Sequence, residues 1–120
     1  MMCPTRLDSP LLDEDVLLTL RRYDLIARVI PRFLAVLPAL MAELLAAIAL
    51  EDRQAAYRCA HRLRGMAAQM GAQALAAAVG EVEAAAVTSA DLRRVCDDTA
   101  LADLSQRTAE SLACLVTERP

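Results

Sequence analysis

The sequence has no lysine and no tryptophan, and its only aromatic residues are two tyrosines and one phenylalanine. It also lacks the basic excess of a typical nucleic-acid-binding domain, because 13 arginines stand against 16 acidic residues and the formal net charge is -3. We therefore expect no nucleic-acid partner. With so few aromatic residues, the hydrophobic 57% of the chain is mostly Ala, Leu, Val, Ile and Met. Such a composition favours closely packed helices.

Closely spaced metal ligands are also missing. The four cysteines are far apart in the chain, and none forms a CxxC or Cys/His pattern: they are Cys3, Cys59, Cys96 and Cys114. No helix offers the Glu-x-x-His pair of a metal-binding bundle. No glycine-rich phosphate-binding loop is present, so a nucleotide-using enzyme is not indicated. We expect no metal and no cofactor of the protein's own.

Targeting segments are not evident. The N-terminal apolar run is too short for a signal peptide. Residues 33–50 are apolar and reach about the minimum length of a membrane span, roughly 18 residues. However, this stretch contains Pro38 and Glu43 and is rich in alanine rather than leucine, which favours a buried helix. We expect a cytoplasmic protein that does not insert into a membrane.

The chain length allows one domain with one core, spanning residues 1–120. Residues 1–8 are expected to form a loose lead-in and residues 118–120 to fray. Between them, apolar residues recur at helical spacing and no strand-like alternation occurs. The pattern predicts helices over about 10–22, 24–50, 53–70, 72–86 and 92–117. Short loops favour antiparallel neighbours, so we expect an all-α, up-down four-helix bundle with a short additional N-terminal helix, and a monomer.

Individual residues mark where these helices begin, end or bend. Ser9 and Pro10 are suited to the start of the first helix. Pro31 and Pro38 predict a break or kink in the second, because proline removes a backbone donor. Thr88 and Ser89 are candidate caps for the last helix, whose polar middle, 97–103, predicts a bend or break. For the third helix, we expect Asp52 as N-cap and Gly71 as left-handed C-cap.

The third helix carries the only histidine of the chain. At 100° per residue, its apolar face includes Leu63 and Met70, which we expect to be buried. His61 falls on the opposite face, so we expect an exposed imidazole rather than a core histidine. An ordinary solvated polar face is the alternative interpretation. Gly65 argues against it, since a glycine within a helix costs about 1 kcal/mol relative to alanine and would clear space beside the ring for another molecule.

These residues resemble the histidine phosphotransfer (HPt) domain. The matching positions are Ala60, His61, Leu63, Gly65, Gly71, Ala72, Leu75 and Glu83, and the likeness extends over roughly residues 12–115. The sequence departs from the family pattern at three positions. Arg64 replaces the usual lysine, Met66 replaces a small residue and Val82 replaces a leucine. The first two departures bear on partner choice.

The resemblance implies a phosphocarrier in a bacterial two-component phosphorelay rather than an enzyme. His61 would accept a phosphoryl group at Nε2 from a receiver-domain aspartyl phosphate and pass it to another receiver. Glu83 is the candidate for holding Nδ1–H, and Arg64 for contacting phosphate or receiver. The partner-binding candidates on the same helix are Arg58, Gly65, Ala68 and Gln69. The partners implied are response-regulator receivers and a hybrid sensor kinase, and any Mg²⁺ would belong to the receiver.

Two other functions fit the same sequence. One is the phosphoacceptor domain of a chemotaxis-type kinase, which receives its phosphoryl group from an ATP-binding domain. The other is a helical interaction module that keeps the fold without transferring phosphate. Replacing His61 by glutamine separates these functions, because it abolishes relay and leaves pure scaffolding intact. A metal-binding bundle is a more distant alternative.

Overall fold

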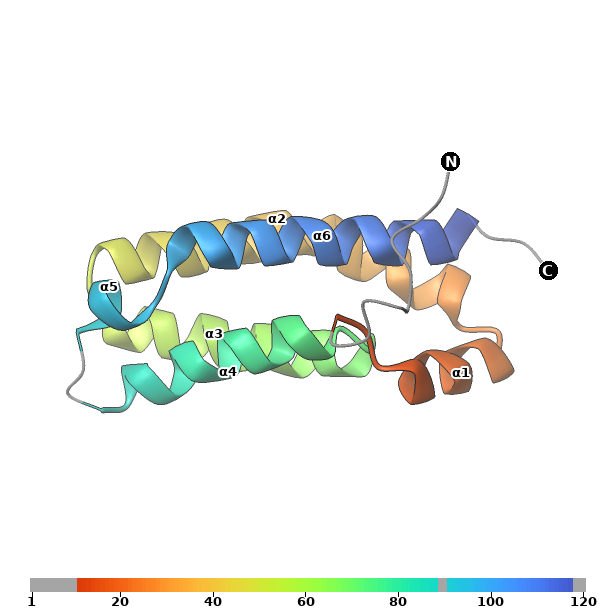
Figure 1. The fold of residues 1–120 in the computed structure, drawn as a ribbon, viewed down its shortest axis with the longest axis horizontal. Coiled ribbons are helices and arrows are strands. Elements are labelled where there is room, and N and C mark those ends of the chain that lie inside the picture. Colours follow the sequence, from red (N-terminus) through yellow and green to blue (C-terminus); the bar gives the residue numbers. More distant parts are fainter. Residues whose placement is uncertain (1–10, 89–90, 118–120) are drawn as a thin grey trace.

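The computed structural model describes residues 11–88 and 91–117, which form six helices joined by short connections (Figure 1). In chain order the helices are α1 (Glu14–Arg22), α2 (Ile26–Ala49), α3 (Arg53–Gln69), α4 (Gln73–Ala86), α5 (Leu92–Val95) and α6 (Asp98–Thr117). No strand occurs in these two described ranges. The all-helical fold class is therefore confirmed. The expected lead-in, 1–8, and the frayed end, 118–120, lie outside the described residues.

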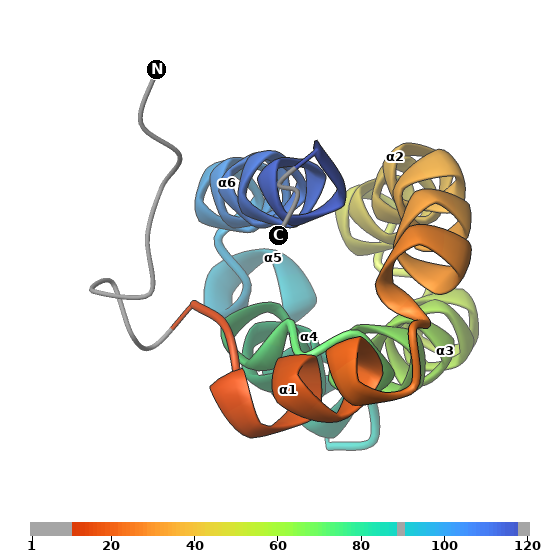
Figure 2. The same cartoon turned by 90° about the vertical axis from the view of Figure 1, so that its right-hand side faces the viewer.

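The four long helices surround one core. α3 packs against α4, α2 packs against α6, and the α2–α3 and α4–α6 contacts join the two pairs (Figure 2). Each long helix contributes fully or almost fully buried aliphatic side chains, for example Leu44, Leu63, Leu75 and Leu112. The up-down four-helix bundle stays our interpretation of this packing. α1 and α5 lie at opposite ends of the molecule (Figure 1).

α2 is the longest and most apolar helix. It runs without a break through Pro31 and Pro38, so the helix does not end at either proline, and a kink there stays a prediction. By length and composition alone, α2 could cross a membrane. In the structure it packs on α3 and α6, and its buried side chains include Ile30, Phe33 and Leu37. The bundle therefore uses α2 as a core helix.

α3 begins at the expected residue and ends one residue earlier than the sequence pattern predicts, with Met70 rather than Gly71 as its C-cap. The Asp52 side chain accepts a hydrogen bond from the backbone N–H of Ala55 and caps the N-terminus. Gly71 follows the C-cap residue Met70 and has φ +76°, a conformation that glycine adopts without strain. These two residues fix the length of α3 and the turn that brings α4 back against it.

α1 begins later than the sequence pattern predicts. Asp13 is its N-cap, accepting from the N–H groups of Asp15 and Val16, and the preceding residues 11 and 12 are not helical. The expected start at Ser9 and Pro10 is therefore wrong, and those two residues lie outside the described range. The backbone N–H of Asp13 donates to the carbonyl of Gly71, which fastens the entry of α1 to the α3–α4 turn.

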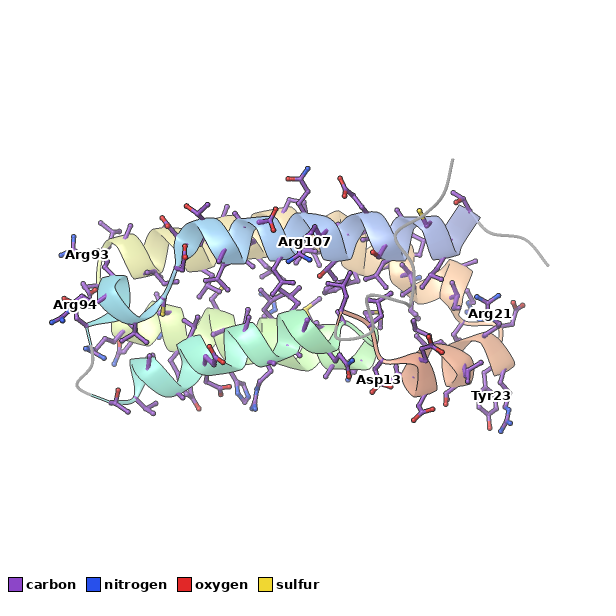
Figure 3. All side chains as sticks on the ribbon, in the orientation of Figure 1. Asp13, Arg21, Tyr23, Arg93, Arg94 and Arg107 are labelled. Atoms are coloured by element: carbon purple, nitrogen blue, oxygen red, sulfur yellow. The ribbon has the colours of Figure 1, made fainter. Side chains whose placement is uncertain are left out.

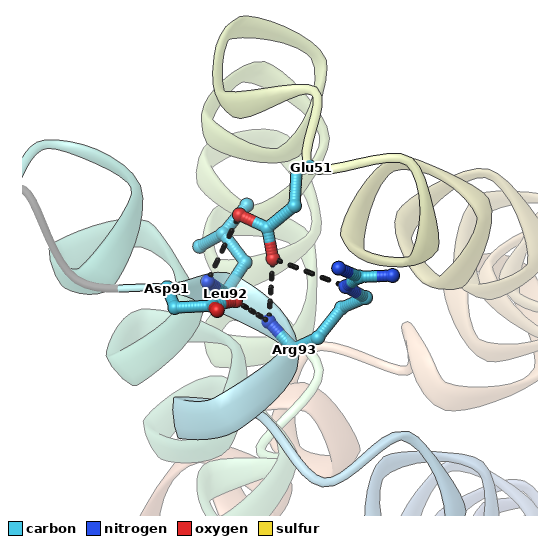
Figure 4. Close-up of polar contacts among 4 residues, drawn as sticks. All are labelled: Glu51, Asp91, Leu92 and Arg93. Carbon is cyan, nitrogen blue, oxygen red and sulfur yellow. Dashed lines mark hydrogen bonds and ion pairs between the residues drawn. The ribbon is translucent and has the colours of Figure 1, made fainter.

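The last predicted helix is divided into α5 and α6, as its polar middle indicated. Asp91, not Thr88 or Ser89, caps α5 by accepting from the N–H of Arg93, and Ser89 lies outside the described residues. Glu51, from the α2–α3 turn, also accepts from the N–H groups of Leu92 and Arg93 (Figure 4). Polar contacts thus tie α5 to the turn before α3.

The two ends of the molecule carry different polar groups. Arg93 and Arg94 extend from α5 at one end, whereas Arg21 and Tyr23 lie at the end formed by α1 (Figure 3). Hydrogen bonds connect each end to the α3–α4 pair. At one end, Glu51 in the turn before α3 accepts from the backbone of α5; at the other, the backbone N–H of Asp13 donates to Gly71 in the α3–α4 turn. The middle of α3 and α4 lies between these two hydrogen-bonded connections.

Candidate functional site

The two faces of α3 separate as the sequence pattern indicates. Its core face is fully buried at Ala56, Ala60, Leu63 and Ala67. The His61 side chain on the opposite face is 59% exposed. Met70 is only partly buried, so its expected burial is wrong. It occupies the C-cap position at the end of the helix, where it packs against the edge of the core.

A carboxylate from α4 meets the histidine. Nδ1 of His61 lies 2.6 Å from Oε2 of Glu83, and the Glu83 side chain is only 12% exposed. An ionised carboxylate can only accept hydrogen bonds, so the proton in this contact belongs to Nδ1. In the neutral ring Nε2 then carries a free lone pair. Nε2 has no hydrogen-bond partner among residues 11–88 and 91–117.

Arg64 binds the other oxygen of the same carboxylate. Its Nε lies 2.8 Å from Oε1 of Glu83, and its side chain is about half exposed. A nearly buried carboxylate is costly unless its charge is compensated and its oxygens accept hydrogen bonds. Here both oxygens have a donor. His61, Arg64 and Glu83 therefore form one connected cluster between α3 and α4.

Tyr57 stacks on the imidazole, although no role was predicted for this residue. The two ring centroids are 5.8 Å apart and the ring planes differ by 12°. Tyr57 precedes His61 by four residues, so the two side chains are neighbours on the helix surface. The spacing of four residues is the feature of the sequence from which this contact could have been predicted. The ring of His61 is thus held by a hydrogen bond at Nδ1 and by an aromatic face.

The remaining candidates lie around the histidine on the exposed side of α3. Arg58, Gly65, Ala68 and Gln69 are all exposed. A Cβ atom built at Gly65 would meet nothing within 4 Å, so the surface beside His61 is open there. On the N-terminal side, a groove of about 240 Å³ runs between α3 and the end of α4, lined by Arg53, Gln54, Tyr57, Arg58, Ala86 and Val87.

The charge of α3 differs from that of the whole chain. Arg53, Arg58, Arg62 and Arg64 lie on this helix, which contains no Asp or Glu, whereas the net charge of the protein is -3. Among the described residues, Arg58 makes no hydrogen bond or ion pair, so its charge is available to a partner. The exposed histidine therefore lies on a locally positive surface.

Metal ligands do not converge anywhere in the described parts of the chain, since no group of three His, Cys, Asp or Glu side chains lies close enough to hold an ion. Cys59 lies beside the groove between α2 and α3 and donates a hydrogen bond to the carbonyl of Leu40. Burial, with a smaller contribution from the negative charge of Glu43, raises the pKa of this thiol. Cys59 is thus a weakly reactive thiol at neutral pH.

Comparison with known proteins gives one match. The family model described as "Hpt domain" matches residues 28–113, a range that begins within α2, includes α3 and α4, and ends within α6. No curated protein and no solved structure matches the chain.

Proposed function

Because this chain belongs to the Hpt domain family, we propose that it relays phosphoryl groups between receiver domains through His61. Hpt domains serve histidine phosphotransfer in phosphorelays, where they interact with receiver domains and act as phosphocarriers rather than classical enzymes. The proposal for this chain is a cytoplasmic carrier whose partners are response-regulator receivers and a hybrid sensor kinase. The His61–Glu83 contact is the observation that supports it most directly.

The proposed transfer begins with Nε2 of His61 as the nucleophile. Its lone pair attacks the phosphorus of a receiver aspartyl phosphate. The N–P bond forms as the P–O bond to the aspartate breaks, and the receiver carboxylate leaves with the electron pair. The ring then carries a positive charge that it shares with Nδ1–H, and the carboxylate of Glu83 faces that charge at 2.6 Å. Glu83 thereby stabilises the phosphorylated ring.

Delivery to the next receiver reverses these steps. An aspartate oxygen forms the new P–O bond, the N–P bond breaks and its electron pair returns to Nε2. The receiver supplies its own Mg²⁺ and carboxylates for the transferring group, as expected where the carrier has little catalytic machinery. The carrier's own contribution is the orientation of the ring and the charge around it.

Arg64 has donors to spare in this scheme. Its Nε is engaged by Glu83, but a guanidinium also has four N–H donors on its two Nη groups. We assign these donors to the phosphoryl oxygens or to the acidic rim of the receiver's active site. Arg58 contributes further positive charge, and Gly65, Ala68 and Gln69 form the surface on which the receiver packs.

The test is a transfer experiment with a radiolabelled phosphorylated receiver and the purified protein. The expected result is a label on the protein that is lost in acid and kept in base, as phosphohistidine requires. His61 is the only histidine in the chain, so such a label can be attached at only one residue. The variant His61→Gln should take up no label while remaining helical by circular dichroism.

A second phosphodonor shows whether a negative result means that the proposal is wrong or only that the wrong receiver was tested. Phosphoramidate transfers its phosphoryl group to imidazole nitrogen and releases ammonia, with no partner protein. If neither phosphoramidate nor any receiver labels His61 in the folded protein, the carrier function is wrong and an interaction module takes its place. Labelling by an ATP-bound kinase domain alone, with no transfer from receivers, would instead identify a chemotaxis-type phosphoacceptor.

A further inference from the structure

Gly80 lies within the continuous helix α4, where the backbone conformation does not require a glycine. It is the eighth residue of the fourteen-residue helix Gln73–Ala86, and its φ is not positive, in contrast to that of Gly71. A glycine in the interior of a helix costs about 1 kcal/mol relative to alanine. The reason for a glycine at this position must therefore be sought in what lies beside it.

The neighbour of Gly80 is the side chain of Arg64. A Cβ atom built at Gly80 would lie 3.2 Å from Cδ of Arg64, tighter than an ordinary van der Waals contact, and apart from the adjacent residues and the nearby backbone of α4 it would meet no other described atom within 4 Å. The aliphatic stem of Arg64 thus crosses α4 at the one position where that helix has no side chain. Beyond this crossing, Nε of Arg64 reaches Oε1 of Glu83 at 2.8 Å.

Gly80 and Glu83 are three residues apart on α4, and His61 and Arg64 are three residues apart on α3. Each pair therefore shares one side of its helix. Across the two helices, the open position at Gly80 admits Arg64, Arg64 holds one oxygen of Glu83, and the other oxygen meets Nδ1 of His61. The four residues make one chain of contacts that ends at the imidazole.

We propose that Gly80 is a positioning residue: it makes room for Arg64 to fix the Glu83 carboxylate in the orientation that holds His61 in its Nδ1–H form. The inference rests on the proposed function for its effect on phosphorylation, but its effect on the ring can be measured without any phosphoryl transfer. A side chain at position 80 displaces Arg64, frees Glu83 to rotate and leaves Nδ1 without a fixed acceptor.

The first measurement is the tautomer of the single histidine. Nitrogen chemical shifts of the His61 ring, recorded at alkaline pH where the ring is neutral, report Nδ1–H against Nε2–H. The wild-type protein should show Nδ1–H alone. Gly80→Leu should show a mixture, because an imidazole without a partner at Nδ1 populates both forms. Ala77→Leu, which adds the same side chain at an exposed position on α4, should retain the wild-type spectrum.

The second measurement is the rate of phosphorylation by phosphoramidate. Gly80→Leu should lower this rate about two- to fivefold, the range expected for loss of one partly exposed ion pair. Arg64→Met keeps the stem of the side chain and removes its charge, so it should give the same loss. Since both variants break the same chain of contacts, the double variant should be no slower than the slower single variant.

Two results would overturn the inference. One is a wild-type tautomer in both Gly80→Leu and Arg64→Met, since the cluster would then not control the ring. The other is full additivity of the two rate losses. If Gly80→Leu does not fold, Arg64→Met and the smaller Gly80→Ala still provide the tautomer test. A protein in which the tautomer responds as expected but His61 takes no phosphoryl group would contradict the proposed function and leave the positioning role in place.

Discussion

Oε2 of Glu83 lies 2.6 Å from Nδ1 of His61, although the two residues are 22 positions apart and belong to different helices. This contact makes the two nitrogens of the ring unequal. Nδ1 keeps its proton and faces a nearly buried carboxylate, whereas the ring as a whole is 59% exposed. We therefore expect Nε2 to be the nitrogen that accepts a phosphoryl group, and the contact predicts which phosphohistidine isomer forms.

Removal of Glu83 should change both the rate and the product of phosphorylation. We expect Glu83→Ala to slow labelling by phosphoramidate about tenfold, the lower end of the effect of a hydrogen bond to a charged group. Part of the product should then be phosphorylated at Nδ1, and phosphorus NMR distinguishes this isomer from the Nε2 isomer. Glu81→Ala removes an exposed carboxylate two residues away on α4 and serves as the control. Exclusive Nε2 product at the wild-type rate in Glu83→Ala would show that Glu83 has no orienting role.

The stacked ring of Tyr57 should contribute a smaller effect. Aromatic pairs are worth about 0.5–1.5 kcal/mol beyond the area that they bury, so Tyr57→Leu should slow phosphorylation by about two- to tenfold. Tyr57→Phe keeps the aromatic face that lies 5.8 Å from the imidazole and should retain the wild-type rate. Nuclear relaxation of the His61 ring would show greater motion in the leucine variant alone. Equal losses in both variants would assign the effect to the hydroxyl group instead.

Replacing Gly65 or Gly71 by alanine should change the stability of the fold in opposite directions. Gly71 has φ +76°, and a Cβ atom there would lie 3.2 Å from the carbonyl oxygen of Asp13 and from Leu17, so Gly71→Ala should destabilise the fold by at least about 1 kcal/mol. The Cβ atom added by Gly65→Ala would meet no atom within 4 Å, so this variant should stabilise α3 by up to about 1 kcal/mol. Urea unfolding measures both.

The same Gly65 variant also tests the partner surface. If the open space beside His61 admits the receiver, Gly65→Ala should slow transfer from a phosphorylated receiver and leave labelling by phosphoramidate unchanged. The small donor needs only the exposed Nε2, whereas the receiver must pack against the helix. Equal rates with both donors would place the receiver elsewhere on α3.

Helical periodicity predicted the long helices, whereas the predicted caps were correct at the start of α3 but not at the starts of α1 and α5. The separation of α3 into a buried and an exposed face follows from apolar spacing, and Asp52 and Gly71 mark its ends through local backbone chemistry. The prolines of α2 were harder to interpret. Each removes one hydrogen bond, but the helix is held by burial along its length, and tertiary packing keeps Pro31 and Pro38 within one continuous helix.

The contacts between helices were less accessible to the sequence. The resemblance to a family pointed to Glu83, but periodicity alone gives neither the distance from His61 nor the engagement of Arg64 with the same carboxylate. Nothing in the spacing of residues along α4 places Gly80 beside the side chain of Arg64. Capping of α5 by Glu51 likewise depends on two turns that meet only in the folded chain. Long-range pairings of this kind carry no local signal.

A final prediction concerns the thiol of Cys59 and the pH dependence of stability. Burial is the main cause that raises its pKa above the ordinary value of 9.0, and the negative charge of Glu43 adds to the effect. In the unfolded chain the thiol therefore loses its proton at lower pH than in the folded protein. The thiol's contribution to stability is complete below about pH 9 and is lost as pH rises through the folded pKa.

Urea unfolding between about pH 8 and about pH 10 tests this sign. The variant Cys59→Ser keeps a donor that can reach the carbonyl of Leu40 but does not titrate in this range. The pKa of Cys96 is also raised, mainly by burial, so both proteins should carry Cys96→Ser to isolate one thiol. The free energy of unfolding should fall more steeply with pH when Cys59 is present. Parallel pH profiles for the two proteins would mean that Cys59 titrates alike in the folded and unfolded states, and its burial against α2 would then not disfavour the thiolate.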